Sequence, residues 1–122
     1  MPTQKPSSNN NIFDIPSALE RTGGDYSFLK ELIDLYIEEF STKLNQLKKA
    51  IAQKNFPEIQ EIGHSIKGSS GNLSLLFLQQ VSYEVEKAGK EKDITKAEKS
   101  THFLENESKR LKSFLETQEE FK

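Results

Sequence analysis

The chain has 122 residues, of which 34% are hydrophobic and 30% charged, which suits one compact domain built from strongly amphipathic helices. Its 17 basic and 19 acidic residues leave no positive surplus for binding nucleic acid, and the absence of cysteine excludes disulfides, thiolate zinc sites and cysteine nucleophiles. No signal peptide and no run of 18 apolar residues occurs, so we expect a soluble, cytoplasmic protein that does not contact the membrane.

A polar tail comes first in chain order. Residues 1–11 are rich in Pro, Ser and Asn and have almost nothing to bury, which predicts a disordered segment. The starting methionine ahead of such a tail favours a free-standing protein. The folded domain is expected over residues 12–122. It begins with a short helix from Pro16 to Leu19, which the glycine pair at 23 and 24 ends.

A long amphipathic helix is predicted next, from Tyr26 to about Gln53, with Asp25 as its N-cap. Its apolar residues are three and four positions apart, as on one buried face of a helix. The predicted buried face consists of Phe28, Leu32, Leu35, Tyr36, Phe40, Leu44, Leu47 and Ile51.

Three further helices complete the prediction. Asn55 caps a helix over residues 56–72, Ser74 caps one that ends near Gly89, and Asp93 caps a long last helix. No strand pattern occurs, so the sequence predicts an all-α fold, an antiparallel four-helix bundle with the short N-terminal helix across one end. The expected core residues are Ile59, Ile62, Ile66 and Leu73, then Leu75, Leu78, Val81 and Val85, and finally Ile94, Ala97, Thr101, Leu104, Leu111 and Leu115.

Signatures of catalysis are scarce in this sequence. It has two histidines, His64 and His102, and lacks a P-loop, a dinucleotide-binding glycine turn and a GxSxG motif. Neither histidine has the partners of a transition-metal site, so no metal or cofactor is expected. His102 follows the expected core position Thr101, and we interpret it as an ordinary surface or half-buried residue.

The segment that begins at His64 is the informative one. His64 lies two residues from core positions on either side, which places it on nearly the opposite face of the helix, exposed to solvent. Lys67, Gly68 and Gly71 follow three, four and seven residues later and share that face. Glycine inside a helix costs about 0.5 to 1 kcal/mol relative to alanine, so two glycines on one exposed face call for a reason.

Two interpretations of this face are open. In the structural one, Gly68 and Gly71 permit close helix packing or mark a frayed helix, and His64 is an ordinary surface residue. In the functional one, the two glycines form a docking face where another protein approaches His64, and Lys67 supplies positive charge for an anionic group on the imidazole. Histidine has a reference pKa of about 6.5, so a neutral, nucleophilic imidazole is available near neutral pH. The combination indicates a phosphoryl-accepting histidine.

The run from His64 to Leu73, His-Ser-Ile-Lys-Gly-Ser-Ser-Gly-Asn-Leu, resembles the motif of the histidine phosphotransfer (HPt) family of multistep two-component phosphorelays. In that motif the order is His, any residue, Leu or Ile, Lys, Gly and two small residues. The Gly23-Gly24-Asp25 turn before a long helix, Leu78 and the Val85-Glu86 pair also match the family. The resemblance covers the chain apart from residues 1–11.

The resemblance implies a role for several residues. His64 would be the phosphoacceptor, Lys67 would balance the phosphoryl charge, and Gly68 would leave space for a receiver domain. Glu86 would orient the imidazole by a hydrogen bond. Two positions depart from the family, which usually has glycine at Ser74 and in some members Gln at Glu86; an ionised Glu accepts hydrogen bonds but cannot donate one.

The function implied is that of a phosphorelay carrier. His64 would receive a phosphoryl group from the aspartyl phosphate of one receiver domain and pass it to the aspartate of another. The chain has no nucleotide motif and no convincing acidic cluster for Mg²⁺, so it is not expected to be a kinase, and the receiver must bring the metal. The expected partners are response-regulator receiver domains, including those of a hybrid sensor histidine kinase. The chain itself is expected to be a monomer. The alternative is a non-catalytic helical adaptor that docks a signalling partner through the same face.

Overall fold

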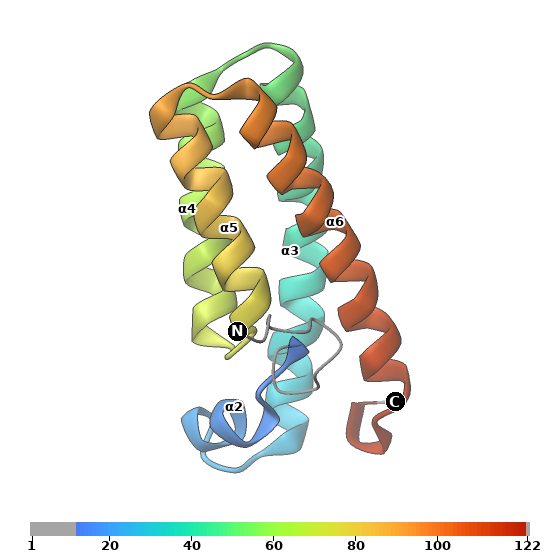
Figure 1. Cartoon of the computed structure of the whole chain (residues 1–122). Helices are drawn as coiled ribbons and strands as arrows, with labels where there is room; N and C mark the ends of the chain where they lie inside the picture. The colour runs from blue at the N-terminus through green and yellow to red at the C-terminus, as the bar shows by residue number, and fades with distance from the viewer. Residues whose placement is uncertain (1–11, 122) are drawn as a thin grey trace, which may run out of the picture.

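The structure, a computed structural model, describes residues 12–121, so the tail predicted for residues 1–11 lies outside the described part of the chain. Within residues 12–121 the secondary structure is helical and contains no strand. The helices pack as a bundle of α3 to α6, with α2 across one end (Figure 1). This confirms the predicted all-α architecture. The elements are α2 (Ile15–Arg21), α3 (Tyr26–Ala52), α4 (Phe56–Asn72), α5 (Leu76–Glu91), α6 (Ile94–Glu116) and the 3₁₀ turn η1 (Glu119–Phe121).

Three side chains cap the helices as predicted. The carboxylate of Asp25 accepts a hydrogen bond from the backbone of Phe28, and Asp93 does the same for Lys96. The amide oxygen of Asn55 accepts from the backbone of Glu58 at 3.3 Å. Each cap satisfies a backbone N–H that the first turn of a helix leaves without a partner. The starts of α3, α4 and α6 therefore agree with the sequence-based prediction.

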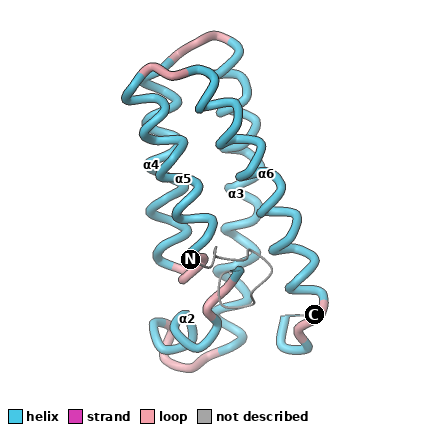
Figure 2. The backbone as a smooth tube through the Cα atoms, in the orientation of Figure 1, coloured by secondary structure: helices cyan, strands magenta, loops and turns pink. Residues whose placement is uncertain are grey.

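Short connections at alternate ends of the bundle make the neighbouring helices antiparallel (Figure 2). Each connection contains one non-glycine residue with a left-handed backbone: Lys54 at φ 53°, Ser74 at φ 59° and Lys92 at φ 57°. After each of these residues, the next backbone N–H bonds back to a carbonyl of the preceding helix, at 2.8 to 2.9 Å. This is the hydrogen-bond pattern of a Schellman ending, which turns the chain sharply after its last helical residue.

The predicted cap of α5 is wrong. Its N-cap is Leu75, which makes no side-chain capping bond. Ser74 instead has the left-handed conformation that follows the end of α4, a conformation that glycine adopts without strain. The Ser74 hydroxyl donates to the Ser17 hydroxyl at 3.1 Å, and its carbonyl accepts from the Asp14 backbone, so this loop anchors α2.

The buried face of α3 also differs from the prediction in its first turns. Phe28 and Leu35 are 47% and 55% exposed, whereas Leu29 and Ile33 are buried. A shift of one residue rotates a helix face by about 100°, and the N-terminal part of α3 has apolar residues on both faces. From Tyr36 onward the predicted face holds. The buried residues of α3 are Leu29, Ile33, Tyr36, Phe40, Leu44, Leu47 and Ala50.

Two glycines let α4 and α5 approach each other closely. A Cβ on Gly63 would lie 2.6 Å from the backbone nitrogen of Glu86, and a Cβ on Gly89 would overlap the backbone nitrogen of Gln60. Real Cβ atoms do not come this close to backbone, so only glycine fits at either position. The predicted end of α5 near Gly89 agrees with the structure, in which the helix continues two residues beyond this glycine to Glu91. The backbones of α4, which carries His64, and α5 are therefore in direct contact at both glycines.

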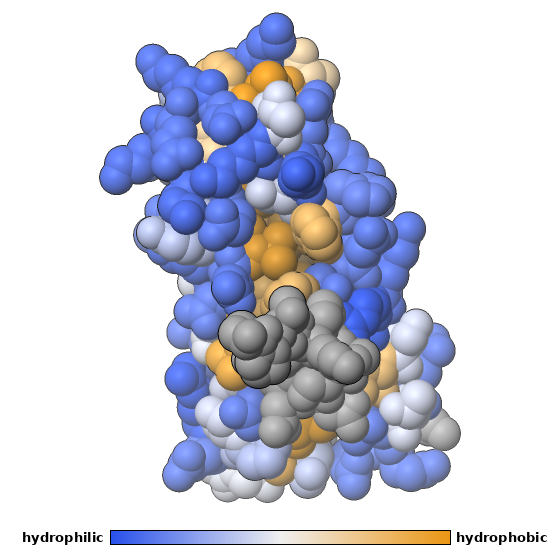
Figure 3. Space-filling view, in the orientation of Figure 1, coloured by the Kyte–Doolittle hydropathy of each residue, from blue (hydrophilic) through white to orange (hydrophobic). Residues whose placement is uncertain are grey.

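The surface of the described residues is mainly hydrophilic in the view of Figure 3, with a small apolar area near the middle of that face. No helix in the described part of the chain has both the length and the apolar character needed to cross a bilayer.

Candidate functional site

His64 lies in the middle of α4, and 68% of its side chain is exposed to solvent. The residues around it in the chain explain this position. Ile62 and Ile66 are buried in the core, and Gly63 packs against α5. The predicted exposure of His64 is confirmed.

The imidazole is held by a carboxylate from the neighbouring helix. His64 Nδ1 lies 3.0 Å from Glu86 Oε2, a hydrogen-bond distance between α4 and α5. An ionised carboxylate can only accept, so this bond favours the neutral tautomer whose proton is on Nδ1. The lone pair of Nε2 is then free. An exposed imidazole in this tautomer is suited to attack an electrophile.

Glu86 also holds the Lys67 side chain. Lys67 Nζ lies 2.8 Å from Glu86 Oε1, so each carboxylate oxygen has one partner from α4. Burial of Glu86 by itself would raise its pKa. The hydrogen bonds and charges of Lys67 and His64 outweigh burial, and the pKa of Glu86 lies below its ordinary value of 4.5. Glu86 is therefore ionised at neutral pH.

The sequence analysis did not identify Tyr83, which contacts the cluster formed by His64, Lys67 and Glu86. The Lys67 ammonium lies 5.2 Å from the centroid of the Tyr83 ring, and the Lys87 ammonium lies 4.9 Å from it. Tyr83 is 45% exposed and three residues before Glu86, so both lie on the same face of α5. The signal available in the sequence was an aromatic residue one turn before Glu86 and outside the apolar positions predicted for its helix.

The two glycines of the predicted docking face differ in structure. A Cβ on Gly68 would meet nothing within 4 Å, so helix packing does not explain this glycine. Gly71 is half-buried, and a Cβ there would lie 2.7 Å from the amide nitrogen of the Gln79 side chain. The Gly71 carbonyl also accepts a hydrogen bond from Arg21 at 3.1 Å. Only Gly68 is bare beside His64, and a docking role for either glycine stays a prediction.

His102 is exposed on α6, in a separate shallow depression that Lys48 and Glu105 also line. Lys48 and Glu105 form an ion pair of 3.0 Å there. Within the described range of residues 12–121, no group of three or more His, Cys, Asp or Glu side chains is placed to hold a metal ion.

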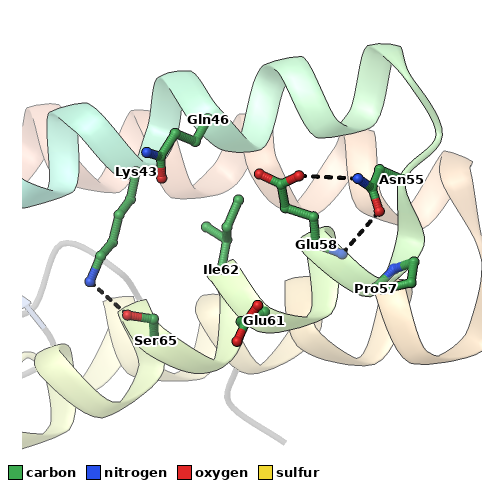
Figure 4. A pocket seen from close by; sticks show the side chains of 8 residues that line it. All are labelled: Lys43, Gln46, Asn55, Pro57, Glu58, Glu61, Ile62 and Ser65. Carbon is green, nitrogen blue, oxygen red and sulfur yellow. Dashed lines mark hydrogen bonds between the residues drawn. The ribbon is translucent and has the colours of Figure 1, made fainter.

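A polar groove runs between α3 and α4, and His64 does not line it (Figure 4). On one side of it, Lys43 donates a hydrogen bond of 2.6 Å to the hydroxyl of Ser65. Farther along the same two helices, the buried hydroxyls of Tyr36 and Ser70 lie 2.6 Å apart. Burial raises the pKa of Tyr36, so its hydroxyl stays neutral. Both contacts join α3 to α4 and so support the helix that presents His64.

Known proteins match the helical part of this chain. The Hpt domain family model matches residues 31–117. The chain is 29% identical over 82 residues to multistep phosphorelay regulator 1 of Schizosaccharomyces pombe, a match that covers 66% of this chain and 27% of that protein. It is 29% identical over 85 residues to the phosphorelay intermediate protein YPD1 of Saccharomyces cerevisiae, covering 69% of this chain and 46% of the relative.

The matched segment thus spans less than half the length of either relative. No solved structure matches the chain significantly. The family model covers most of the helical bundle and includes the whole segment from His64 to Glu86. The chain belongs to the Hpt domain family.

Proposed function

We propose that this chain carries phosphoryl groups between receiver domains, with His64 as the phosphoacceptor. The observation that carries the proposal is the exposed imidazole held through Nδ1 by Glu86 at 3.0 Å, in a chain of the Hpt domain family. Both relatives described above are named as phosphorelay proteins. The bare surface at Gly68, one turn beyond His64, supports approach of a partner to the imidazole.

The transfer step uses the free lone pair of Nε2. This lone pair attacks the phosphorus of an aspartyl phosphate, the Nε2–P bond forms and the P–O bond breaks. The aspartate leaves as a carboxylate with the electron pair of the broken bond. The Nδ1 proton stays in its hydrogen bond to Glu86 throughout. Attack by a second aspartate on the phosphorus reverses these changes and restores neutral His64.

Lys67 is the cation that shares the Glu86 carboxylate with His64. Its ammonium is ion-paired with Glu86 at 2.8 Å, and its side chain is 29% exposed. A phosphoryl group on His64 would compete with Glu86 for this ammonium, because charge-assisted hydrogen bonds to phosphate oxygens are strong. Lys67 would then balance part of the phosphoryl charge.

The Mg²⁺ that phosphoryl transfer usually requires would come with the receiver domain. The chain would therefore act as a carrier and not as a kinase. Its partners would be response-regulator receiver domains, including those of hybrid sensor histidine kinases, and it would act as a monomer in the cytoplasm. The adaptor alternative predicts binding of the same partners without any covalent step.

The test is transfer from purified phosphorylated receiver domains to the parent chain, with phosphate lability as the readout. Phosphohistidine is labile in acid and stable in base. We expect such a label on the parent and on His102→Gln, which lacks the other histidine, but not on His64→Gln. Because His64 is exposed, His64→Gln should unfold within about ±0.5 kcal/mol of the parent. Labelling of His64→Gln would refute the assignment, and receiver binding without labelling would favour the adaptor.

A further inference from the structure

Lys67 touches two side chains of α5 at once. Its ammonium is 2.8 Å from Glu86 Oε1 and 5.2 Å from the centroid of the Tyr83 ring. The second distance is within the range of a cation–π contact, in which the negative face of the ring attracts the ammonium. An exposed lysine on its own would sample many rotamers. Here two contacts hold its end beside His64.

We propose that Tyr83 is a positioning residue for phosphoryl transfer: its ring keeps the Lys67 ammonium beside His64 when the phosphoryl group draws that ammonium away from Glu86. The inference rests on the proposed function of His64 as the phosphoacceptor. It assigns to Tyr83 a role through Lys67 and no contact with the reacting atoms.

The electrostatics of the cluster support this role. Glu86 is an anion bound to the same imidazole that would receive the phosphoryl group, so phosphorylation places two negative groups around one lysine. If Lys67 turns toward the phosphoryl oxygens, it gives up the ion pair of 2.8 Å that restrains it at present. The Tyr83 ring attracts a cation through its quadrupole but carries no net charge. Tyr83 can therefore hold Lys67 both before and after phosphorylation of His64, without repelling the phosphoryl group.

A second lysine, Lys87, also contacts the Tyr83 ring, so the rival explanation is that Tyr83 acts through Lys87 instead of Lys67. Lys87 Nζ lies 4.9 Å from the Tyr83 centroid and 3.4 Å from Glu84. Lys87 has no contact to Glu86 or His64 comparable with that of Lys67. If Tyr83 acted through Lys87, its effect would survive loss of Lys67. The two lysines can thus be separated by mutation.

The experiment measures the rate at which His64 is phosphorylated by phosphoramidate. In this reaction Nε2 attacks phosphorus, the P–N bond of the donor breaks, and ammonia leaves with the electron pair. The donor is too small to require a protein interface, so a rate change reports on the site and not on docking. The variants are Tyr83→Leu, Tyr83→Phe, Lys67→Ala and the double variant Tyr83→Leu/Lys67→Ala. Phe103→Leu, which removes a 53% exposed aromatic on α6, is the matched control.

We expect Tyr83→Leu to lower the loading rate, meaning the rate of His64 phosphorylation by phosphoramidate, about two- to fivefold. This is the fold-change that corresponds to the free energy of an exposed cation–π contact. Tyr83→Phe keeps the ring face and should load near the parental rate, as should Phe103→Leu. In the Lys67→Ala background, Tyr83→Leu should cause no further loss, because its effect passes through the lysine.

Three results would overturn the inference: a parental rate for Tyr83→Leu, an equal loss in Tyr83→Phe, or an undiminished effect of Tyr83→Leu without Lys67. A loss seen only with phosphorylated receiver domains, and not with phosphoramidate, would make Tyr83 a docking residue instead. Failure of the proposed function is a different observation, namely no loading of His64 in the parent. In that case the ring-current shift of the Lys67 side-chain protons still tests the contact, since it should vanish in Tyr83→Leu and persist in Tyr83→Phe.

Discussion

Gly63 on α4 lies directly against the backbone of Glu86 on α5. A Cβ on Gly63 would be 2.6 Å from the Glu86 nitrogen and 2.9 Å from its Cα. The absent side chain lets the two helices approach at the residue just before His64. Because of this approach, the Glu86 side chain can reach both His64 at 3.0 Å and Lys67 at 2.8 Å.

Replacing Gly63 with alanine is expected to separate α4 and α5 at the site. The contact atoms are backbone and cannot move aside cheaply, so we expect Gly63→Ala to lower the free energy of unfolding by about 1 to 3 kcal/mol. Gly68→Ala is the matched control on the same helix, with nothing within 4 Å of its Cβ. It should raise the free energy of unfolding by about 0.5 to 1 kcal/mol through helix propensity. Urea unfolding measures both, and equal effects of the two variants would contradict the packing argument.

Gly68→Gln tests whether the bare surface serves a partner. The space above Gly68 is open, so glutamine should leave the bundle as stable as the parent or more stable by up to about 1 kcal/mol. Transfer from a receiver domain should slow strongly, since a misplacement of about 1 Å can cost roughly 10²-fold in rate. Unfolding and transfer are measured on the same preparation. A variant that unfolds more easily yet transfers at the parental rate would return Gly68 to a packing role.

Glu86→Gln is expected to weaken the preference of neutral His64 for the tautomer with its proton on Nδ1. The glutamine oxygen can accept from Nδ1–H, but its amide can also turn and donate to an unprotonated Nδ1, which the carboxylate cannot do. Nitrogen-15 NMR of neutral His64 should show mainly the Nδ1–H form in the parent and a mixture in the variant. Equal amounts of the two tautomers would lower phosphoramidate loading about twofold. An unchanged tautomer ratio would mean that the Glu86 contact does not select it.

The pH dependence of stability follows from the lowered pKa values of Glu86 and Glu105. For Glu105 the main cause is the hydrogen bond from Lys48, and for Glu86 the partners Lys67 and His64 outweigh burial. When the folded-state pKa is below the ordinary 4.5, protons bind the unfolded chain first as the pH falls. The contribution of both groups is therefore complete above about pH 4.5 and lost as the pH falls through the folded-state pKa.

Urea unfolding at a series of pH values measures this loss. Glu86→Gln and Glu105→Gln should each show a smaller decrease than the parent between pH 5 and lower values, because each lacks one of the titrating groups. Parental slopes in both variants would show that neither ion pair contributes to stability.

The local features of this protein could be predicted from the sequence alone. The helix periodicity and the N-terminal caps depend on neighbours within one or two turns. The same is true of the helix face that His64, Lys67 and Gly68 share. Such neighbours are close in space whatever the rest of the chain does. For the same reason, the exposure of His64 followed from two buried isoleucines in its own helix.

Only the tertiary structure decided which residues of different helices meet. It selected Leu29 and Ile33 over Phe28 and Leu35 for the core, because both faces of α3 are apolar there and packing chooses between them. It placed Gly89 against the backbone of Gln60, and it brought Tyr83 to Lys67. Distances between helices depend on the side chains of both partners, and no periodicity in one chain segment contains that information.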